Sequence, residues 1–79
     1  MSELDAATLL AFGERLRAIR VRSEISQEGL ADLADLDRTY ISLLERGKRN
    51  PSLVCVAKLA RALKVTVSEL CDFAGTGAA

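Results

Sequence analysis

The side chains of this chain that could bind a charged partner are its basic residues, and they are gathered in one stretch of the sequence. The chain carries no net charge, yet residues 1–14 sum to −3, residues 65–79 to −2 and residues 15–64 to +5. From Arg38 to Lys64 there are seven basic residues and one acidic residue. A basic segment between acidic ends is typical of a surface that binds a polyanion, although solvated helix surfaces would show the same pattern.

The sequence shows no residues whose types and spacing would suit catalysis or metal binding. The chain has no histidine, which is the commonest general base, and no serine has a partner at a recognisable spacing. No glycine-rich phosphate loop is present. Cys55 and Cys71 could form one disulfide, but we interpret them as reduced thiols that behave as small buried hydrophobic residues. Because two isolated cysteines cannot fill a zinc site, we predict no catalytic residue, no metal and no cofactor, and hence no enzyme.

The composition predicts one helical domain. Apolar residues make up 49% of the chain and are mostly alanine, leucine, valine and isoleucine, which favours a folded helical protein. A chain of 79 residues forms a single domain. We expect order over about residues 5–73 and a short flexible tail from Ala74 to Ala79. No apolar stretch approaches the roughly 18 residues of a membrane span, and the acidic N-terminus is unlike a signal peptide, so we expect a cytoplasmic protein.

Five helices are predicted from the apolar spacing and the capping residues. They span about residues 5–22, 26–35, 37–47, 52–63 and 66–73. The predicted N-caps Ser26, Asp37 and Thr66 each lie between two apolar residues at hydrophobic-staple positions, and Glu69 completes a capping box with Thr66. Gly47 is a natural helix C-terminus. The apolar set of the fourth helix is Leu53, Val56, Leu59, Ala60 and Leu63.

The second and third predicted helices are joined very tightly. Only about three residues separate them, so the two helices cannot lie antiparallel and must cross steeply. This crossing is the helix-turn-helix arrangement. The predicted fold class is therefore all-α, a compact five-helix domain with a central helix-turn-helix.

Three short strings carry a family resemblance. They are SQEGLA at 26–31, DRTYIS at 37–42 and ERGKRNPS at 45–52. Together they resemble the lambda-repressor-like helix-turn-helix of the Cro/cI (XRE-type) regulators, over roughly Phe12 to Phe73. The DRTYIS string is similar in particular to the controller proteins of restriction–modification systems. The resemblance implies a DNA-binding transcriptional regulator of a restriction–modification or phage-type operon.

The resemblance also implies two structural details. Arg20 and Glu45 occupy positions that form a partly buried ion pair between the first helix and the end of the third. Asp35 stands where the family usually has glycine, because the backbone there is left-handed. Aspartate tolerates that conformation better than most residues, so we expect the turn to survive with some strain.

The resemblance assigns the residues that would contact DNA. The recognition helix places its N-terminal residues on base edges in the major groove, here Arg38, Thr39 and Ser42. The Arg38 guanidinium can donate two hydrogen bonds to guanine, although a phosphate contact or a solvated charge is the alternative. Phosphate contacts are expected at helix N-termini and in the basic loop, from Ser26, Gln27, Tyr40, Arg46, Lys48, Arg49, Asn50 and Ser52. Gln27 could instead be an ordinary surface residue, and Tyr40 could equally be half-buried core.

Residues not assigned to DNA contacts suggest further partners. Family members dimerise so that two recognition helices meet successive major grooves about 34 Å apart, and we predict a homodimer. The candidate interface is Val54, Val65, Val67, Leu70 and Phe73, which could instead simply close the small core. We interpret Lys58, Arg61 and Lys64 as a solvated face rather than DNA contacts. Glu28 and Asp32 lie four residues apart on one helix and are either an RNA polymerase sigma-factor contact or solvated charges.

A second function class stays open at this point. The helical scaffold could be a protein-interaction module, such as an antitoxin, for which DNA binding is secondary. Binding to bulk DNA at low salt would separate the two classes.

Overall fold

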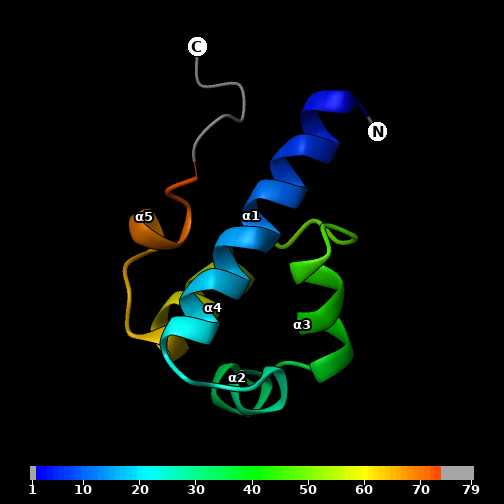
Figure 1. Ribbon diagram of the computed structural model, residues 1–79. Helices are drawn as coiled ribbons and strands as arrows, with labels where there is room; N and C mark the ends of the chain where they lie inside the picture. Colours follow the sequence, from blue (N-terminus) through cyan, green and yellow to red (C-terminus); the bar gives the residue numbers. More distant parts are fainter. Residues whose placement is uncertain (1, 74–79) are drawn as a thin grey trace.

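The computed structural model describes residues 2–73, and all regular structure in that part of the chain is helical. The helices are α1 (Glu3–Arg22), α2 (Gln27–Ala34), α3 (Arg38–Glu45), α4 (Leu53–Leu63) and α5 (Val67–Leu70). Helix α1 runs the length of the molecule, and the shorter helices are arranged around its C-terminal half (Figure 1). The all-α prediction with five helices is confirmed for the described residues, whereas the predicted tail, 74–79, lies outside them.

Three helix boundaries differ from the prediction by two residues or more, one of them at the end of α3, which stops at Glu45 rather than at Gly47. Helix α1 begins at Glu3 rather than near Asp5, because the Ser2 hydroxyl accepts the Asp5 N–H (3.1 Å) and the Asp5 carboxylate accepts the Ser2 N–H (3.4 Å). This reciprocal capping box satisfies free N–H groups of the first turn. At the other end α5 stops at Leu70, short of the predicted Phe73.

Three of the four helix junctions are built from the same three-residue pattern: Glu24-Ile25-Ser26, Asp35-Leu36-Asp37 and Lys64-Val65-Thr66. The first residue of each is left-handed, with φ of 58°, 56° and 59°. The second is apolar, packs against the core and donates its N–H to a carbonyl five residues back, over 3.2, 2.9 and 3.0 Å. The third is the N-cap of the next helix. This Schellman geometry turns the chain within three residues, and it confirms the left-handed Asp35 expected from the sequence.

The fourth junction, between α3 and α4, is longer and begins with glycine. Gly47 has φ of 71°, and the N–H groups of Gly47 and Lys48 close the end of α3 on the carbonyls of Leu44 (3.0 Å) and Leu43 (2.9 Å). A Cβ atom at Gly47 would lie 2.9 Å from the Cα of Leu10 in α1. Because α1 passes directly over this residue, glycine is needed here for space as well as for φ.

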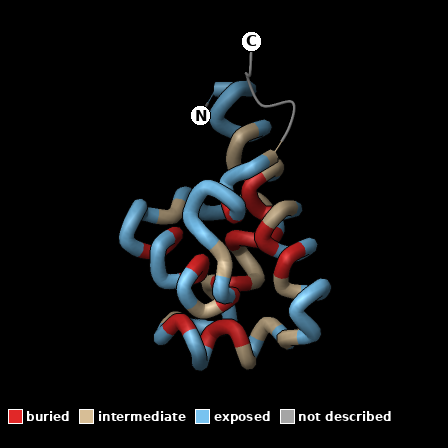
Figure 2. Tube along the Cα trace, turned by 90° about the vertical axis from the view of Figure 1, so that its left-hand side faces the viewer, coloured by how far each residue is buried: buried red, intermediate tan, exposed pale blue. Residues whose placement is uncertain are grey.

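The core takes side chains from all five helices. Those with no exposed surface are Leu16, Ile19, Leu30, Ile41, Leu44, Leu59 and Leu70. Figure 2 shows the buried residues along the faces that the helices turn toward one another. Gly13 of α1 lies against the end of α3, where a Cβ atom would clash with the Leu44 carbonyl oxygen. A glycine inside a helical apolar pattern was the sequence signal for this close approach, which the prediction did not use.

Two apolar residues do not lie where the sequence pattern placed them. Leu53, expected on the apolar face of the fourth helix, is 75% exposed, because it is the first residue of α4 and precedes the part of the helix that packs. Both cysteines are free; Cys55 is buried as predicted, but Cys71 is exposed because it follows the end of α5 at the surface. Within residues 2–73 we find no helix with the length and apolar character that a membrane crossing requires.

Candidate nucleic-acid interface

The first turn of α3 presents two of the three predicted base-contact residues to solvent. Arg38 and Thr39 are exposed, and Ser42, one turn later, is half-buried. The Asp37 carboxylate caps the helix by accepting the Thr39 N–H at 2.7 Å. On the opposite face Ile41 is fully buried, so the packing of α3 fixes the direction in which its first turn points.

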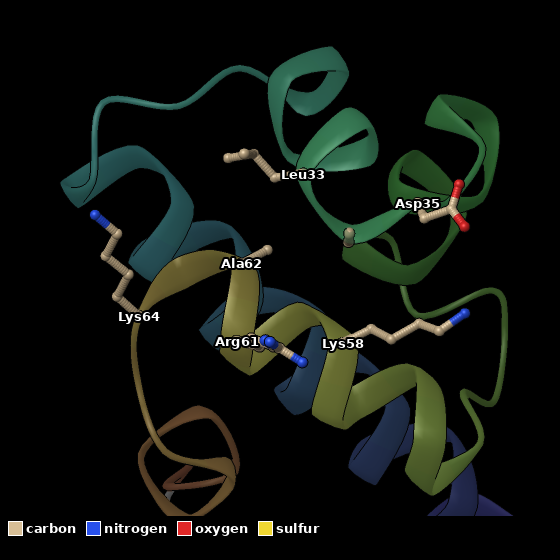
Figure 3. A pocket seen from close by; sticks show the side chains of 7 residues that line it. Leu33, Asp35, Lys58, Arg61, Ala62 and Lys64 are labelled. Atoms are coloured by element: carbon tan, nitrogen blue, oxygen red, sulfur yellow. The ribbon is translucent and has the colours of Figure 1, made fainter.

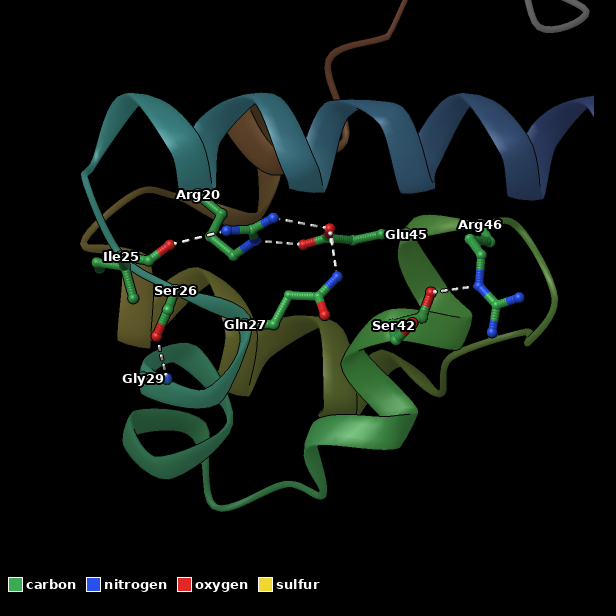
Figure 4. A network of polar contacts seen from close by, with 8 residues as sticks. All are labelled: Arg20, Ile25, Ser26, Gln27, Gly29, Ser42, Glu45 and Arg46. Atoms are coloured by element: carbon green, nitrogen blue, oxygen red, sulfur yellow. Dashed lines mark hydrogen bonds and ion pairs between the residues drawn. The ribbon is translucent and has the colours of Figure 1, made fainter.

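The start of α2 holds the two predicted phosphate ligands in different ways. Ser26 is exposed, and its hydroxyl accepts the Gly29 N–H at 2.9 Å (Figure 4). Gln27 is half-buried and turns its amide toward the end of α3, where Nε2 donates to Oε1 of Glu45 at 3.1 Å. This contact could not be predicted from the sequence, because the two residues are 18 positions apart and lie on different helices.

Glu45 is also the centre of an ion pair with α1. Arg20 donates from Nε to one carboxylate oxygen (2.6 Å) and from Nη2 to the other (3.1 Å), and the two side chains are only 12% and 3% exposed. The pair expected from the resemblance is thus present, with the bidentate geometry that suits buried arginine–carboxylate pairs. The hydrogen bond to Glu45 raises the pKa of Arg20. Since Arg20 also donates to the Ile25 carbonyl (2.9 Å), one network joins α1, the start of α2 and the end of α3 (Figure 4).

The loop after α3 carries most of the remaining predicted phosphate ligands. Arg46, Lys48, Arg49 and Asn50 are all exposed, and within residues 2–73 none of the three cations pairs with a carboxylate. Arg46 lies back along α3, where its Nε donates to the Ser42 carbonyl at 3.4 Å. Next along the chain, Ser52 caps α4 by accepting the Cys55 N–H at 3.0 Å. A groove of about 500 Å³ separates this loop from the N-terminal half of α1.

Comparison with known proteins decides the family. A family model described as a helix-turn-helix domain matches residues 11–76. This chain belongs to the helix-turn-helix domain family. It is 49% identical over 69 residues to the control protein C.BamHI of Bacillus amyloliquefaciens, a match that covers 86% of this chain and 85% of that protein.

Solved helix-turn-helix structures agree with this assignment. The restriction–modification controller protein C.AhdI from Aeromonas hydrophila superposes with a TM-score of 0.80 at 52% identity, over 81% of this chain and 97% of the other. SinR, a master regulator of biofilm formation, superposes with a TM-score of 0.73 at 32% identity, over 77% and 98%, and that structure is a complex with DNA. The resemblance to controller proteins expected from the sequence is therefore confirmed.

Tyr40 lies on the buried side of the helix-turn-helix. The side chain is half-buried and packs against the core. Burial raises the pKa of its hydroxyl, and the neighbouring Cys55 thiol raises it further. Of the two interpretations left open by the sequence, this position favours the half-buried core residue.

Three further basic residues, two on α4 and one at its C-cap, are apart from the loop. Lys58, Arg61 and Lys64 line a groove of about 450 Å³ between α2 and α4, with Leu33 and Ala62 among its apolar residues (Figure 3). Leu33 is 63% exposed. All three cations are exposed, and the solvated face expected for them stays a prediction.

The apolar residues predicted to form a dimer interface divide into three groups. Val54 and Val67 are 66% and 37% exposed and can contact a partner. Val65 and Phe73 are partly buried against the core. Leu70 has no exposed surface, so its assignment to the interface is wrong: its side chain is the one that anchors the short α5 in the core.

Proposed function

We propose that this protein is a sequence-specific transcriptional regulator that binds a palindromic DNA operator as a homodimer in the cytoplasm. We propose further that it controls a restriction–modification operon, since the control protein C.BamHI and the controller C.AhdI are similar to it over most of its length.

One observation carries the proposal. The first turn of α3 is exposed and presents Arg38 and Thr39, while the same helix is held in the core by Ile41 and Leu44. A rigid helix with a free polar first turn is suited to the major groove, where an arginine can read guanine through O6 and N7. The exposed loop at residues 46–50 supplies positive charge for the flanking phosphates.

The dimer is proposed to form through exposed valine and leucine side chains near the start of α4 and on α5. Leu53 and Val54 are 75% and 66% exposed, and Val67 is 37% exposed. Exposed apolar residues that form one contiguous patch typically mark an interaction surface. Leu53 thus joins Val54 and Val67 in the proposed interface, and Leu70 leaves it.

Contact with the RNA polymerase sigma factor is a further part of the proposal. Glu28 and Asp32 are both exposed and lie one turn apart on α2. An acidic pair beside a DNA-facing helix could meet a basic surface of the polymerase bound next to it.

Selection of duplexes from a random library, followed by salt titration, tests the proposal. We expect a palindromic site to be enriched and Arg38→Ala to lose about 1–3 kcal/mol of preference at one symmetric base pair. Arg17→Ala removes an exposed arginine from α1 and is the matched control, for which we expect the preference to be kept. Sedimentation of Leu53→Ser with Val54→Ser should show a shift toward monomer.

Two results would contradict the proposal. The first result is that no sequence is selected and that this protein binds bulk DNA at low salt no better than an ordinary neutral protein does. The protein would then be an interaction module. If Arg38→Ala and Arg17→Ala weaken binding equally at every sequence, the arginine of α3 contributes charge only and does not read bases.

A further inference from the structure

We propose that Glu45, in addition to pairing with Arg20, positions the Gln27 amide to donate a hydrogen bond to a DNA phosphate. The buried ion pair and the DNA contact would then be parts of one network. This inference rests on the proposed function, because it takes the anion at the start of α2 to be a phosphate of the operator.

The carboxylate of Glu45 decides how the Gln27 amide is turned. Its side chain is 3% exposed and accepts three hydrogen bonds, two from Arg20 and one from Nε2 of Gln27. A carboxylate that accepts from arginine offers only acceptor oxygens to other groups. The reversed amide would place its oxygen against a carboxylate oxygen in a buried position, so Glu45 selects the orientation with the nitrogen inward.

One donor of the amide has no hydrogen-bond partner among residues 2–73 after this contact. An amide nitrogen carries two N–H groups, and Glu45 takes one of them. Gln27 is the first residue of α2, and Ser26 already accepts the Gly29 N–H at that end. The remaining N–H groups of the first turn and the positive end of the helix dipole favour an anion at the same place.

Holding the amide in advance should strengthen the DNA contact. A free glutamine loses several rotamers when it binds, and that ordering lowers affinity. Here Glu45 has already ordered the side chain, and Arg20 fixes the backbone just before α2 through the Ile25 carbonyl at 2.9 Å. Gln27 is therefore more than the ordinary surface residue that the sequence allowed.

The first test follows the two Nε2 protons of Gln27 by ¹⁵N–¹H NMR in the wild-type protein, without and with the selected operator duplex. We expect one proton to be shifted by its hydrogen bond to Glu45 and to stay so when DNA is added. The other proton should shift on binding. If both protons take solvent-like positions with DNA, Gln27 leaves Glu45 on binding; if neither moves, it does not contact DNA. Either result overturns the inference, and neither depends on a variant that must fold.

The second test is a double-mutant cycle on operator affinity. Gln27→Met keeps the size of the side chain without the donor and should lower affinity about tenfold, the worth of one hydrogen bond to a charged group. Because glutamine carries no charge, the slope of log affinity against log salt should stay the same. Glu45→Asp keeps the charge but withdraws the carboxylate, and should weaken binding only while Gln27 is present.

A matched control separates positioning from a general change. Glu24→Asp shortens an exposed acid outside the network and should leave affinity unchanged. If Glu45→Asp weakens binding equally with glutamine or methionine at position 27, the coupling is absent and the inference fails. If the wild type itself binds no operator, the proposed function fails first, and the two failures are distinguishable.

Discussion

The three short helix junctions and the one long loop of this protein solve the same problem in different ways. Each must place a residue at positive φ where a helix ends. The short junctions use Glu24, Asp35 and Lys64, whereas the α3–α4 loop uses Gly47. The difference is space. The first three residues are exposed, so the cost of their side chains is confined to the local backbone, while α1 lies directly over Gly47.

Glu24, Asp35 and Lys64 only turn the chain, whereas Gly47 also determines where the basic loop begins. The short junctions end with an N-cap and lead at once into the next helix. The long loop leaves Lys48, Arg49 and Asn50 exposed before Ser52 caps α4. Because Gly47 lies against Leu10 of α1, the packing of α1 fixes the point from which the proposed phosphate ligands extend.

The largest expected effect comes from Gly47→Ala. The left-handed backbone alone costs roughly 1–2 kcal/mol for a residue with a Cβ, and a Cβ pressed against backbone typically adds about 1–3 kcal/mol. We therefore expect a loss of about 3 kcal/mol in the free energy of unfolding, measured by urea denaturation. The control is the pair Lys64→Gly and Lys64→Ala, because the difference between them gives the cost of a Cβ at φ of 59° on an exposed residue. If Gly47→Ala costs no more than that difference, φ, and not the contact with α1, makes glycine necessary.

A smaller and opposite effect is expected when the short junctions receive glycine. Relief of left-handed strain is worth roughly 1–2 kcal/mol, and the added freedom of glycine in the unfolded chain takes back about 0.5–1 kcal/mol. Lys64→Gly and Glu24→Gly should each stabilise the protein by about 0.5–1 kcal/mol in urea denaturation. Asp35→Gly should gain less, because aspartate tolerates this conformation better than lysine or glutamate. A destabilised Lys64→Gly would mean that the lysine side chain makes a contact that outweighs the strain.

The features that could be predicted from the sequence are those decided by near neighbours. The N-caps Ser26, Asp37 and Thr66 were placed correctly, because a cap needs only the residues two or three positions away. The Ser2 cap that lengthens α1 is equally local, and the Ser-x-x-Asp pattern was available in the sequence. The Arg20–Glu45 pair came instead from the family resemblance, since nothing local joins residues 25 positions apart.

The features that could not be predicted depend on how the helices pack. An apolar spacing gives the buried face of a helix but not how far along the helix that face is covered, so Leu53 was assigned to a covered face although it is exposed. For the same reason the sequence could not show that Leu70 is fully buried in the core. The Gln27 side chain points toward Glu45 because the start of α2 packs beside the end of α3. At the candidate interface the sequence therefore predicted a set of residues but not which of them the protein itself engages.

The smallest expected effect concerns pH at the last of the short junctions. The N–H and hydroxyl of Thr66 donate to the Glu69 carboxylate, each at 3.1 Å, and these hydrogen bonds hold the pKa of Glu69 below its ordinary value. A pKa that is lower in the folded state means that the cap stabilises α5 above the ordinary glutamate pKa of about 4.3 and is lost as the pH falls through the lowered value.

Glu69→Gln isolates that contribution from the other carboxylates. We expect the wild type to lose protection of the Leu70 and Cys71 amides against hydrogen exchange in acid, and the variant to lose less between pH 5 and about pH 3. The junction before α2 is the internal control, because its N-cap is the Ser26 hydroxyl, which does not titrate. If wild type and variant respond identically to acid, the Glu69 cap does not hold α5. The short helix would then depend on the buried Leu70 and on the hydrogen bond from Arg15 Nε to the Glu69 carbonyl (2.9 Å).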